Sequence, residues 1–175
     1  MRYSDELRLT FLSGTARTYK DNRARNACEQ GQGPYTSCPR YVLYDYFPEH
    51  GLFLINVGYY ESEEWVLVRQ LNGKEEKIVA PPRYSPDKKW LASVNWSEGP
   101  GQNNGIDIVP TALNPALRLF HYRPKDYALF EFVRWDGSDR LAMRVTIRPQ
   151  STFPVEVVEK NGSWHLKWPL PTPPP

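Results

Sequence analysis

Residues 83–95 read RYSPDKKWLASVN, and this stretch decides the expected fold. The turn-forming residues Ser85 to Lys88 separate a short strand ending at Tyr84 from an apolar strand starting at Trp90. The same order of strand, tight turn and apolar strand begins at Tyr41 and again at Tyr127, so the three starts lie 42 and 44 residues apart. Four short strands recurring every 40–45 residues or so are typical of propeller blades.

The spacing predicts three repeats of four antiparallel strands each, over residues 40–82, 83–126 and 127–168. Within these repeats, Asn72-Gly73 predicts a two-residue hairpin turn and Asn161-Gly162 predicts another turn. Leu52 to Tyr60 is nearly all apolar, which indicates a strand that is covered on both faces.

An N-terminal hairpin is expected within residues 1–22, because Leu7, Leu9 and Phe11 alternate with polar residues. Residues 169–175 contain five prolines and form a tail that cannot donate ladder hydrogen bonds. Between hairpin and tail, residues 1–168 are expected to form a single all-β domain.

The segment from Tyr84 to Ala92 resembles the SPDGK-x-(I/L)-A hairpin of the WD40-like repeats in bacterial TolB-type propellers. In those repeats the turn joins the first strand of a blade to the second, and Lys88 stands where the family usually has glycine. The resemblance implies a small or incomplete β-propeller-like array, although propellers typically have about four to eight blades. A β-sandwich or an open barrel built from the same hairpins is the alternative.

The composition supports the all-β class, and it argues against a nucleic-acid binder and against a membrane-spanning helix. The chain has 11 Gly, 17 Pro and 24 aromatic residues (6 Trp, 11 Tyr and 7 Phe), which favours short strands joined by turns. The formal net charge of +2 comes with few basic clusters, which argues against a dedicated nucleic-acid binder. No run approaches the roughly 18–20 apolar residues of a membrane helix, so no membrane span is expected.

Two cysteines, Cys28 and Cys38, flank the irregular loop of residues 23–39. A disulfide between them would close a loop of about ten residues and contribute about 2–3 kcal/mol. That bond would place the protein in an oxidising compartment, periplasmic or secreted, with a signal peptide removed before Met1. Two free thiols in a cytosolic protein are the alternative interpretation.

Chemical motifs are scarce, so no cofactor or metal is expected. The three histidines show no ligand spacing, and no nucleophile motif accompanies them. His121 is interpreted as a half-buried sheet residue. A carboxylate-dependent hydrolase is a further alternative hypothesis, and its candidate acids are Glu61, Glu63, Glu64, Asp136 and Asp139.

The loop from Trp96 to Gly105 is the most unusual stretch, because it is long, polar and rich in glycine. Loops of this kind on a rigid sheet often carry binding. The predicted binding residues are Trp96, Glu98, Gln102, Asn103, Asn104, Tyr59, Tyr60 and Tyr122. Five tryptophans are assigned instead to the core between sheets: Trp65, Trp90, Trp135, Trp164 and Trp168.

These observations predict a non-enzymatic domain that binds another protein, such as an inhibitor or toxin-neutralising immunity protein of an exported bacterial system. A periplasmic or cell-surface glycan-binding module is the alternative, since stacked aromatics with carboxylates also suit a sugar. We infer no oligomeric state, monomeric or other, from the composition.

Overall fold

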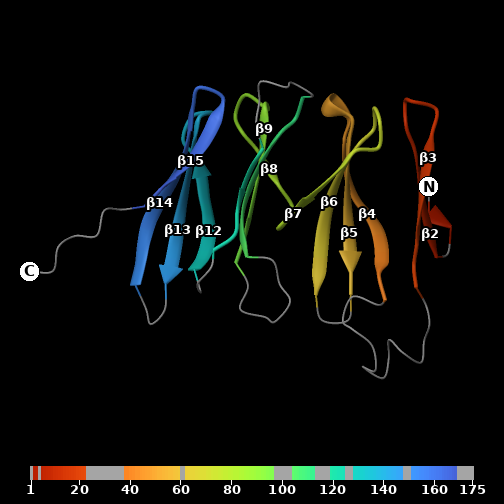
Figure 1. Cartoon of the computed structure of the whole chain (residues 1–175), viewed down its shortest axis with the longest axis horizontal. Coiled ribbons are helices and arrows are strands. Elements are labelled where there is room, and N and C mark those ends of the chain that lie inside the picture. The colour runs from red at the N-terminus through yellow and green to blue at the C-terminus, as the bar shows by residue number, and fades with distance from the viewer. Residues whose placement is uncertain are drawn as a thin grey trace, which may run out of the picture. The chain divides into compact units, whose positions relative to one another are not determined.

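A computed structural model shows an all-β protein whose strands carry the labels of Figure 1. The predicted fold class is confirmed: an N-terminal hairpin sheet is followed by three four-stranded antiparallel sheets, and the sheets do not close into a barrel. The structure describes residues 2–3, 5–22, 38–59, 62–96, 104–112, 119–124, 128–147 and 151–168.

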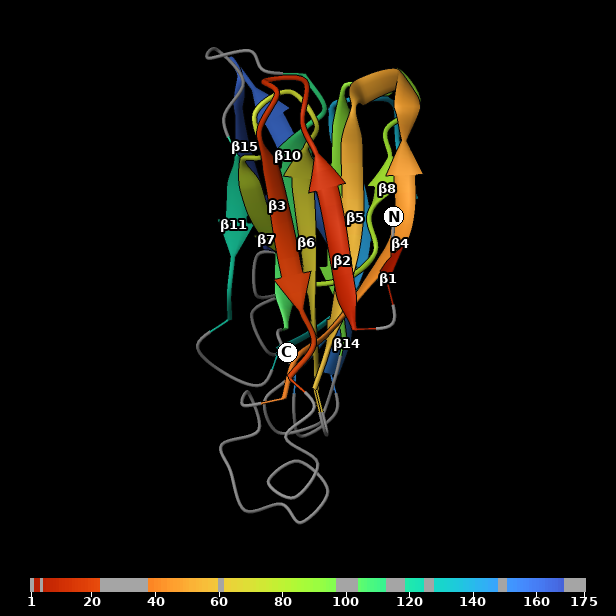
Figure 2. The same cartoon turned by 90° about the vertical axis from the view of Figure 1, so that its right-hand side faces the viewer.

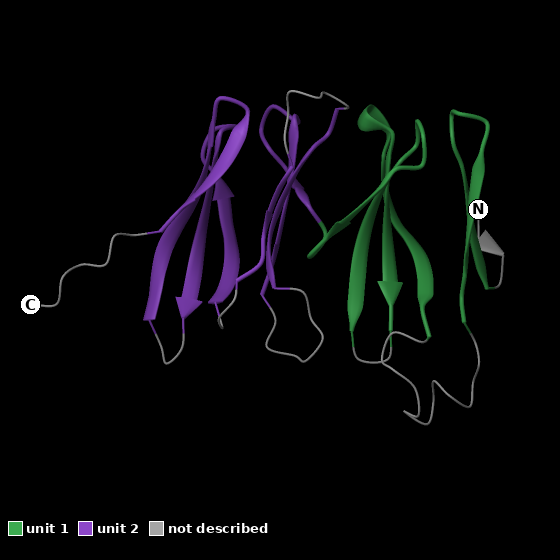
Figure 3. Cartoon of the chain, viewed as in Figure 1, with its two compact units in different colours: residues 1–81, 99–102 green, residues 82–98, 103–175 purple. Residues whose placement is uncertain are grey.

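The chain divides into two compact units (Figure 3). Unit 1 contains residues 1–81 and 99–102, and unit 2 contains residues 82–98 and 103–175. The division between the units falls at Pro81-Pro82. Each unit holds two sheets that share one apolar core.

Unit 1 begins with sheet A, in the order β1-β2-β3, whose hairpin is drawn in red in Figure 2. Its strands are β1 (Arg2–Tyr3), β2 (Glu6–Thr10) and β3 (Ala16–Lys20). Leu7, Leu9 and Phe11 are buried, as their alternation predicts, and they pack against β5 and β6 of the second sheet. Each large apolar side chain removed from water in this way contributes about 1.5–3 kcal/mol.

Sheet B completes unit 1 in the order β4-β5-β6-β7. Its elements are β4 (Arg40–Phe47), the short 3-10 turn η1 (Pro48–His50), β5 (Leu52–Gly58), β6 (Glu63–Arg69) and β7 (Glu75–Ile78). The expectation for β5 is correct, because the neighbouring residues Leu54 and Ile55 point to opposite faces and both are buried.

The turn between β6 and β7 differs from the two-residue hairpin predicted at Asn72-Gly73. The Arg69 N–H donates to the Lys74 carbonyl, so four residues form the loop. A two-residue type I′ turn needs positive φ at both central residues, and Asn72 does not adopt it. Its side chain instead accepts the Lys74 N–H at 3.0 Å. The prediction was therefore wrong about the length of this loop.

Unit 2 contains sheets C and D. Sheet C has the order β11-β10-β9-β8, with β8 (Arg83–Tyr84), β9 (Trp90–Asn95), β10 (Gly105–Pro110) and β11 (Phe120–Tyr122). Sheet D has the order β12-β13-β14-β15, with β12 (Ala128–Trp135), β13 (Arg140–Ile147), β14 (Ser151–Lys160) and β15 (Ser163–Lys167). Their shared core includes Ile106 and Ile108 from sheet C and Phe130 and Val157 from sheet D, all fully buried.

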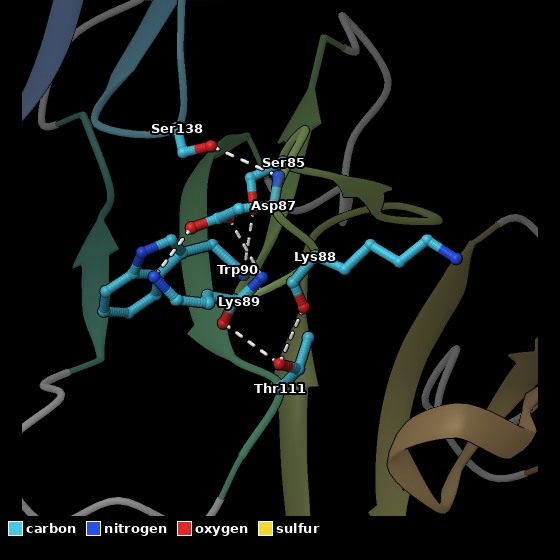
Figure 4. Close-up of polar contacts among 7 residues, drawn as sticks. All are labelled: Ser85, Asp87, Lys88, Lys89, Trp90, Thr111 and Ser138. Atoms are coloured by element: carbon cyan, nitrogen blue, oxygen red, sulfur yellow. Dashed lines mark hydrogen bonds and ion pairs between the residues drawn. The ribbon is translucent and has the colours of Figure 1, made fainter.

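The turn between β8 and β9 is held by a dense set of hydrogen bonds (Figure 4). The buried Ser85 hydroxyl donates to Asp87 Oδ1 at 2.8 Å and accepts the Trp90 N–H at 3.1 Å. Asp87 Oδ1 also accepts the Lys89 N–H, and the Thr111 hydroxyl donates to the Lys88 carbonyl at 2.9 Å. Burial alone would raise the pKa of Asp87, but the bonds from Ser85 and Lys89 outweigh it and hold this pKa below its ordinary value.

Local backbone rules explain two features of β14. Asn161 and Gly162 both have positive φ, and Lys160 pairs with Ser163, so the predicted turn is a two-residue hairpin loop of type I′. Pro154 lies inside β14 but before the stretch that pairs with β15, so its missing N–H interrupts no ladder on that side.

No helix of the described ranges is long and apolar enough to cross a membrane.

Candidate functional site

The candidate site lies at the end of sheet C where β9 leads toward β10. Trp96 follows β9 and Asn104 precedes β10, and the pair Asn95–Gly105 closes the ladder between them. Ile106, one position further into the sheet, pairs with Val94 on one side and with Tyr122 on the other. The structure therefore brings three predicted binding residues, Trp96, Asn104 and Tyr122, to the same end of one sheet.

Trp168 joins them from sheet D. Its ring centroid lies 6.4 Å from that of Tyr122 and 6.0 Å from that of Phe130. Trp96 is 60% exposed and Trp168 is 41% exposed, whereas Tyr122 is half-buried. The assignment of Trp168 to the core was wrong, because it follows the last residue of β15 and its ring reaches the surface. Trp96, Tyr122 and Trp168 are called the aromatic end below.

The remaining predicted binding residues do not add to this group. Tyr59 belongs to unit 1, where it packs beside the core shared by sheets A and B. Burial, followed by the nearby Glu64 carboxylate, raises the pKa of Tyr59 to about 12. Tyr60, Glu98, Gln102 and Asn103 lie outside the described residues, and their roles stay predictions.

A fully buried carboxylate, Asp107, lies in β10 beside the aromatic end. Arg123 holds it with two hydrogen bonds, Nη1 to Oδ1 at 2.7 Å and Nη2 to Oδ2 at 3.1 Å. His121 Nδ1 lies 2.6 Å from Oδ1, and both partner side chains reach the surface. A buried charge needs such partners, so Asp107 fixes Arg123 and His121 at the edge strand β11.

Sequence reasoning missed Asp107 and Arg123, and it placed His121 in a sheet without a partner. The available signal is the pattern Ile106-Asp107-Ile108, an ionisable residue between two isoleucines in a strand that is otherwise apolar. Such a residue is seldom buried unless it is paired. Its partners lie 14 and 16 positions away, so the pairing depends on strand register rather than on a motif.

Gly105 allows β11 to approach β10 at this point. Its φ is +149°, and a Cβ atom added to it would lie 2.2 Å from the Tyr122 carbonyl oxygen and 3.0 Å from the Arg123 side chain. No larger residue fits without displacing that backbone. The glycine that ends the predicted binding loop therefore has a packing role as well.

Three of the five carboxylates considered for hydrolysis, Glu63, Glu64 and Asp136, are engaged in other contacts. Glu63 accepts hydrogen bonds from Asn56 and Trp65, and Glu64 pairs with Lys77 at 2.8 Å. Asp136 lies 3.9 Å from Arg140. Glu61 lies outside the described residues. Within the described part of the chain, no three His, Cys, Asp or Glu side chains gather as metal ligands would.

The predicted disulfide involves Cys28, which lies outside the described residues together with most of its loop. The bond and the oxidising compartment inferred from it therefore stay predictions. Mass spectrometry without reductant tests them directly, because two alkylatable thiols in exported material would contradict both.

No family model, no curated protein and no solved structure matches this chain. The resemblance of Tyr84–Ala92 to TolB-type repeats therefore stays a prediction.

Proposed function

We propose that the chain is a non-enzymatic protein-binding domain that contacts its partner through the aromatic end of unit 2. Within this class we propose an inhibitor or toxin-neutralising immunity protein of an exported bacterial system, working in the periplasm or outside the cell. The two exposed tryptophans, Trp96 and Trp168, are the observation that carries the proposal.

Exposed tryptophan beside arginine is the composition of interface hot spots. Trp96 and Trp168 offer large, rigid apolar surfaces that stay in water unless a partner covers them. Arg123 stands on the same edge of sheet C and is pre-positioned by Asp107, so it loses little side-chain freedom on binding.

The burial of the neighbouring carboxylate, Asp107, favours a protein partner over a glycan. A sugar site usually combines an aromatic platform with polar groups that hydrogen-bond the hydroxyls. The carboxylate of sheet C next to this platform, Asp107, is fully buried and accepts from Arg123 instead. The aromatic end thus presents apolar surface beside the Arg123 guanidinium, a combination that suits a protein surface.

The test begins with capture of proteins from the source organism on the immobilised chain and their identification by mass spectrometry. We then measure the affinity of the identified protein for wild type and for Trp96→Ala. Truncating a hot-spot residue should lower the affinity at least about tenfold. Leu71→Ala is the matched control, since Leu71 is a similarly exposed apolar residue in unit 1 and should leave the affinity unchanged.

Equal binding of Trp96→Ala and wild type would refute the proposed interface. A change of tryptophan fluorescence on titration with cell-wall oligosaccharides, lost in Trp96→Ala, would assign the aromatic end to a glycan instead.

A further inference from the structure

One face of sheet D points away from the core of unit 2. Side chains alternate along each strand, so the neighbours of buried Phe130, Met143 and Val157 occupy this opposite face. We call it the outer face of sheet D. Strand register places the following charged residues on it: Glu131, Arg134, Arg140, Arg144, Glu156, Lys160, His165 and Lys167.

The outer face of sheet D has a positive excess. It carries five Lys and Arg side chains against two Glu side chains, an excess of three positive charges, while the whole chain has a net charge of only +2. The remainder of the molecule is therefore slightly acidic in sum. The near-neutral net charge of the whole chain therefore coexists with one sheet face that has a positive excess.

Only part of this charge is neutralised within the face. Arg144 lies 3.3 Å from Glu131, and Arg140 lies 3.7 Å from Glu156. Arg134, Lys160 and Lys167 are exposed and form no ion pair with any side chain of the described ranges. These three cations come from β12, β14 and β15, so they spread across the whole width of the sheet.

We propose that the outer face of sheet D is a docking surface for an acidic protein surface. The argument is charge complementarity: three unpaired cations on a rigid sheet attract a partner with exposed Asp and Glu and orient it during encounter. The four strands, of five to ten residues, are about 17–33 Å long and lie about 4.8 Å apart, which gives an area of roughly 400 Å². That is about half of one side of a standard interface.

The chemistry of the face favours a protein over a nucleic acid. Sheets that bind single-stranded nucleic acid stack the bases on exposed aromatic rings. The outer face of sheet D has no Trp, Tyr or Phe among its described strand residues; its other members are Thr, Ser, Pro, Ala, Val and Leu. Cations without stacking platforms suit carboxylates on a folded surface.

This inference rests on the proposed function and names the chemistry of the partner. It is tested with a poly-L-glutamate peptide as the acidic probe and a poly-dT oligonucleotide as the competing probe. Binding of both to the full chain is measured by fluorescence anisotropy at about 50 mM and about 300 mM NaCl, because screening weakens exposed charge contacts.

The decisive variant is Arg134→Glu/Lys167→Glu, with Arg134→Gln/Lys167→Gln as a milder second variant. The matched control, Arg8→Glu/Lys74→Glu, makes the same change of net charge at exposed positions of unit 1. We expect wild type to bind poly-L-glutamate at low salt, the first variant to bind at least about tenfold more weakly, and the control to change affinity less than about twofold.

Equal loss in the control and the sheet D variant would overturn the inference, because the effect would then reflect net charge alone. Binding of poly-dT in preference to poly-L-glutamate, lost with Arg134 and Lys167, would overturn it in favour of a nucleic acid. Failure of the proposed function is recognised separately, since it appears as an identified partner that binds Trp96→Ala and wild type equally.

Discussion

Lys88 holds a left-handed backbone conformation, with φ of +57°, in the turn between β8 and β9. It is one of two non-glycine residues with positive φ among the described ranges, and the other, Asn161, belongs to a residue type that tolerates this region. Lysine is not a residue type that favours this region. We therefore expect Lys88→Gly to be more stable than Lys88→Ala, the opposite of the usual order.

The magnitude follows from two opposing contributions. Left-handed backbone costs a residue with a Cβ atom roughly 1–2 kcal/mol, and glycine avoids this cost. Glycine in turn loses about 0.5–1 kcal/mol through the greater freedom of the unfolded chain. The difference favours glycine by about 0.7 kcal/mol, or about 2 °C in Tm for a chain of this length. Both variants lack the ammonium that lies 5.7 Å from the Tyr84 ring, so that contact cancels in the comparison.

Urea unfolding followed by tryptophan fluorescence measures this difference where it arises, because five of the six tryptophans belong to unit 2. Lys74→Gly and Lys74→Ala form the control pair, since Lys74 is exposed and does not have positive φ. There alanine should be the more stable variant. A Lys88→Ala protein as stable as Lys88→Gly, or more so, would refute the strain argument.

Three further outcomes are expected. Gly105→Ala should lower the free energy of unfolding by at least about 2 kcal/mol, because the new Cβ meets the backbone of β11, whereas Gly14→Ala has open space and should cost about 1 kcal/mol in urea unfolding. Asp107→Asn should cost about 1–3 kcal/mol in the same assay, because Arg123 loses its charged partner yet keeps access to water. Stability should fall as pH rises from about 10 through about 12, since Tyr59 ionises in the unfolded chain near 10 but in the folded chain near 12. Chemical unfolding across that range should show a shallower loss for Tyr59→Phe, and an unchanged slope would contradict the assignment.

Strand positions were predictable because their information is local. Alternation of apolar and polar residues, together with breakers such as Pro81-Pro82, located the hairpin and the twelve strands of the three repeats within a few residues. The two Asn-Gly dipeptides show the limit of such rules. Asn161-Gly162 forms the expected turn, whereas the loop at Asn72-Gly73 has four residues and Asn72 lacks the positive φ of a type I′ turn. The Leu12 N–H donates to the Gln70 carbonyl in this loop, a contact between distant residues that no local rule predicts.

The candidate site was predictable only in part, because only some of its residues are marked by a local sequence pattern. The long polar loop after β9 pointed to Trp96 and Asn104, and the structure places Tyr122 at the same end of the sheet. The buried pairing of Asp107 with Arg123 depends on which strands are neighbours, and no local pattern shows that. Trp168 was misassigned because residue type alone does not distinguish a core tryptophan from one beyond the end of an edge strand.

Each sheet in the described part of the chain is a meander in which consecutive strands are neighbours, and this order has a consequence for synthesis. Each strand can pair as soon as the next one leaves the ribosome, without waiting for a distant partner, so closure of the sheets requires only short loops. Sheet B needs nothing beyond residue 78 to complete its ladder, when more than half of the chain is still to be made. During synthesis the growing edge of each sheet is therefore unpaired only until the next hairpin forms, and in the finished sheet only the two outermost strands keep an unpaired edge.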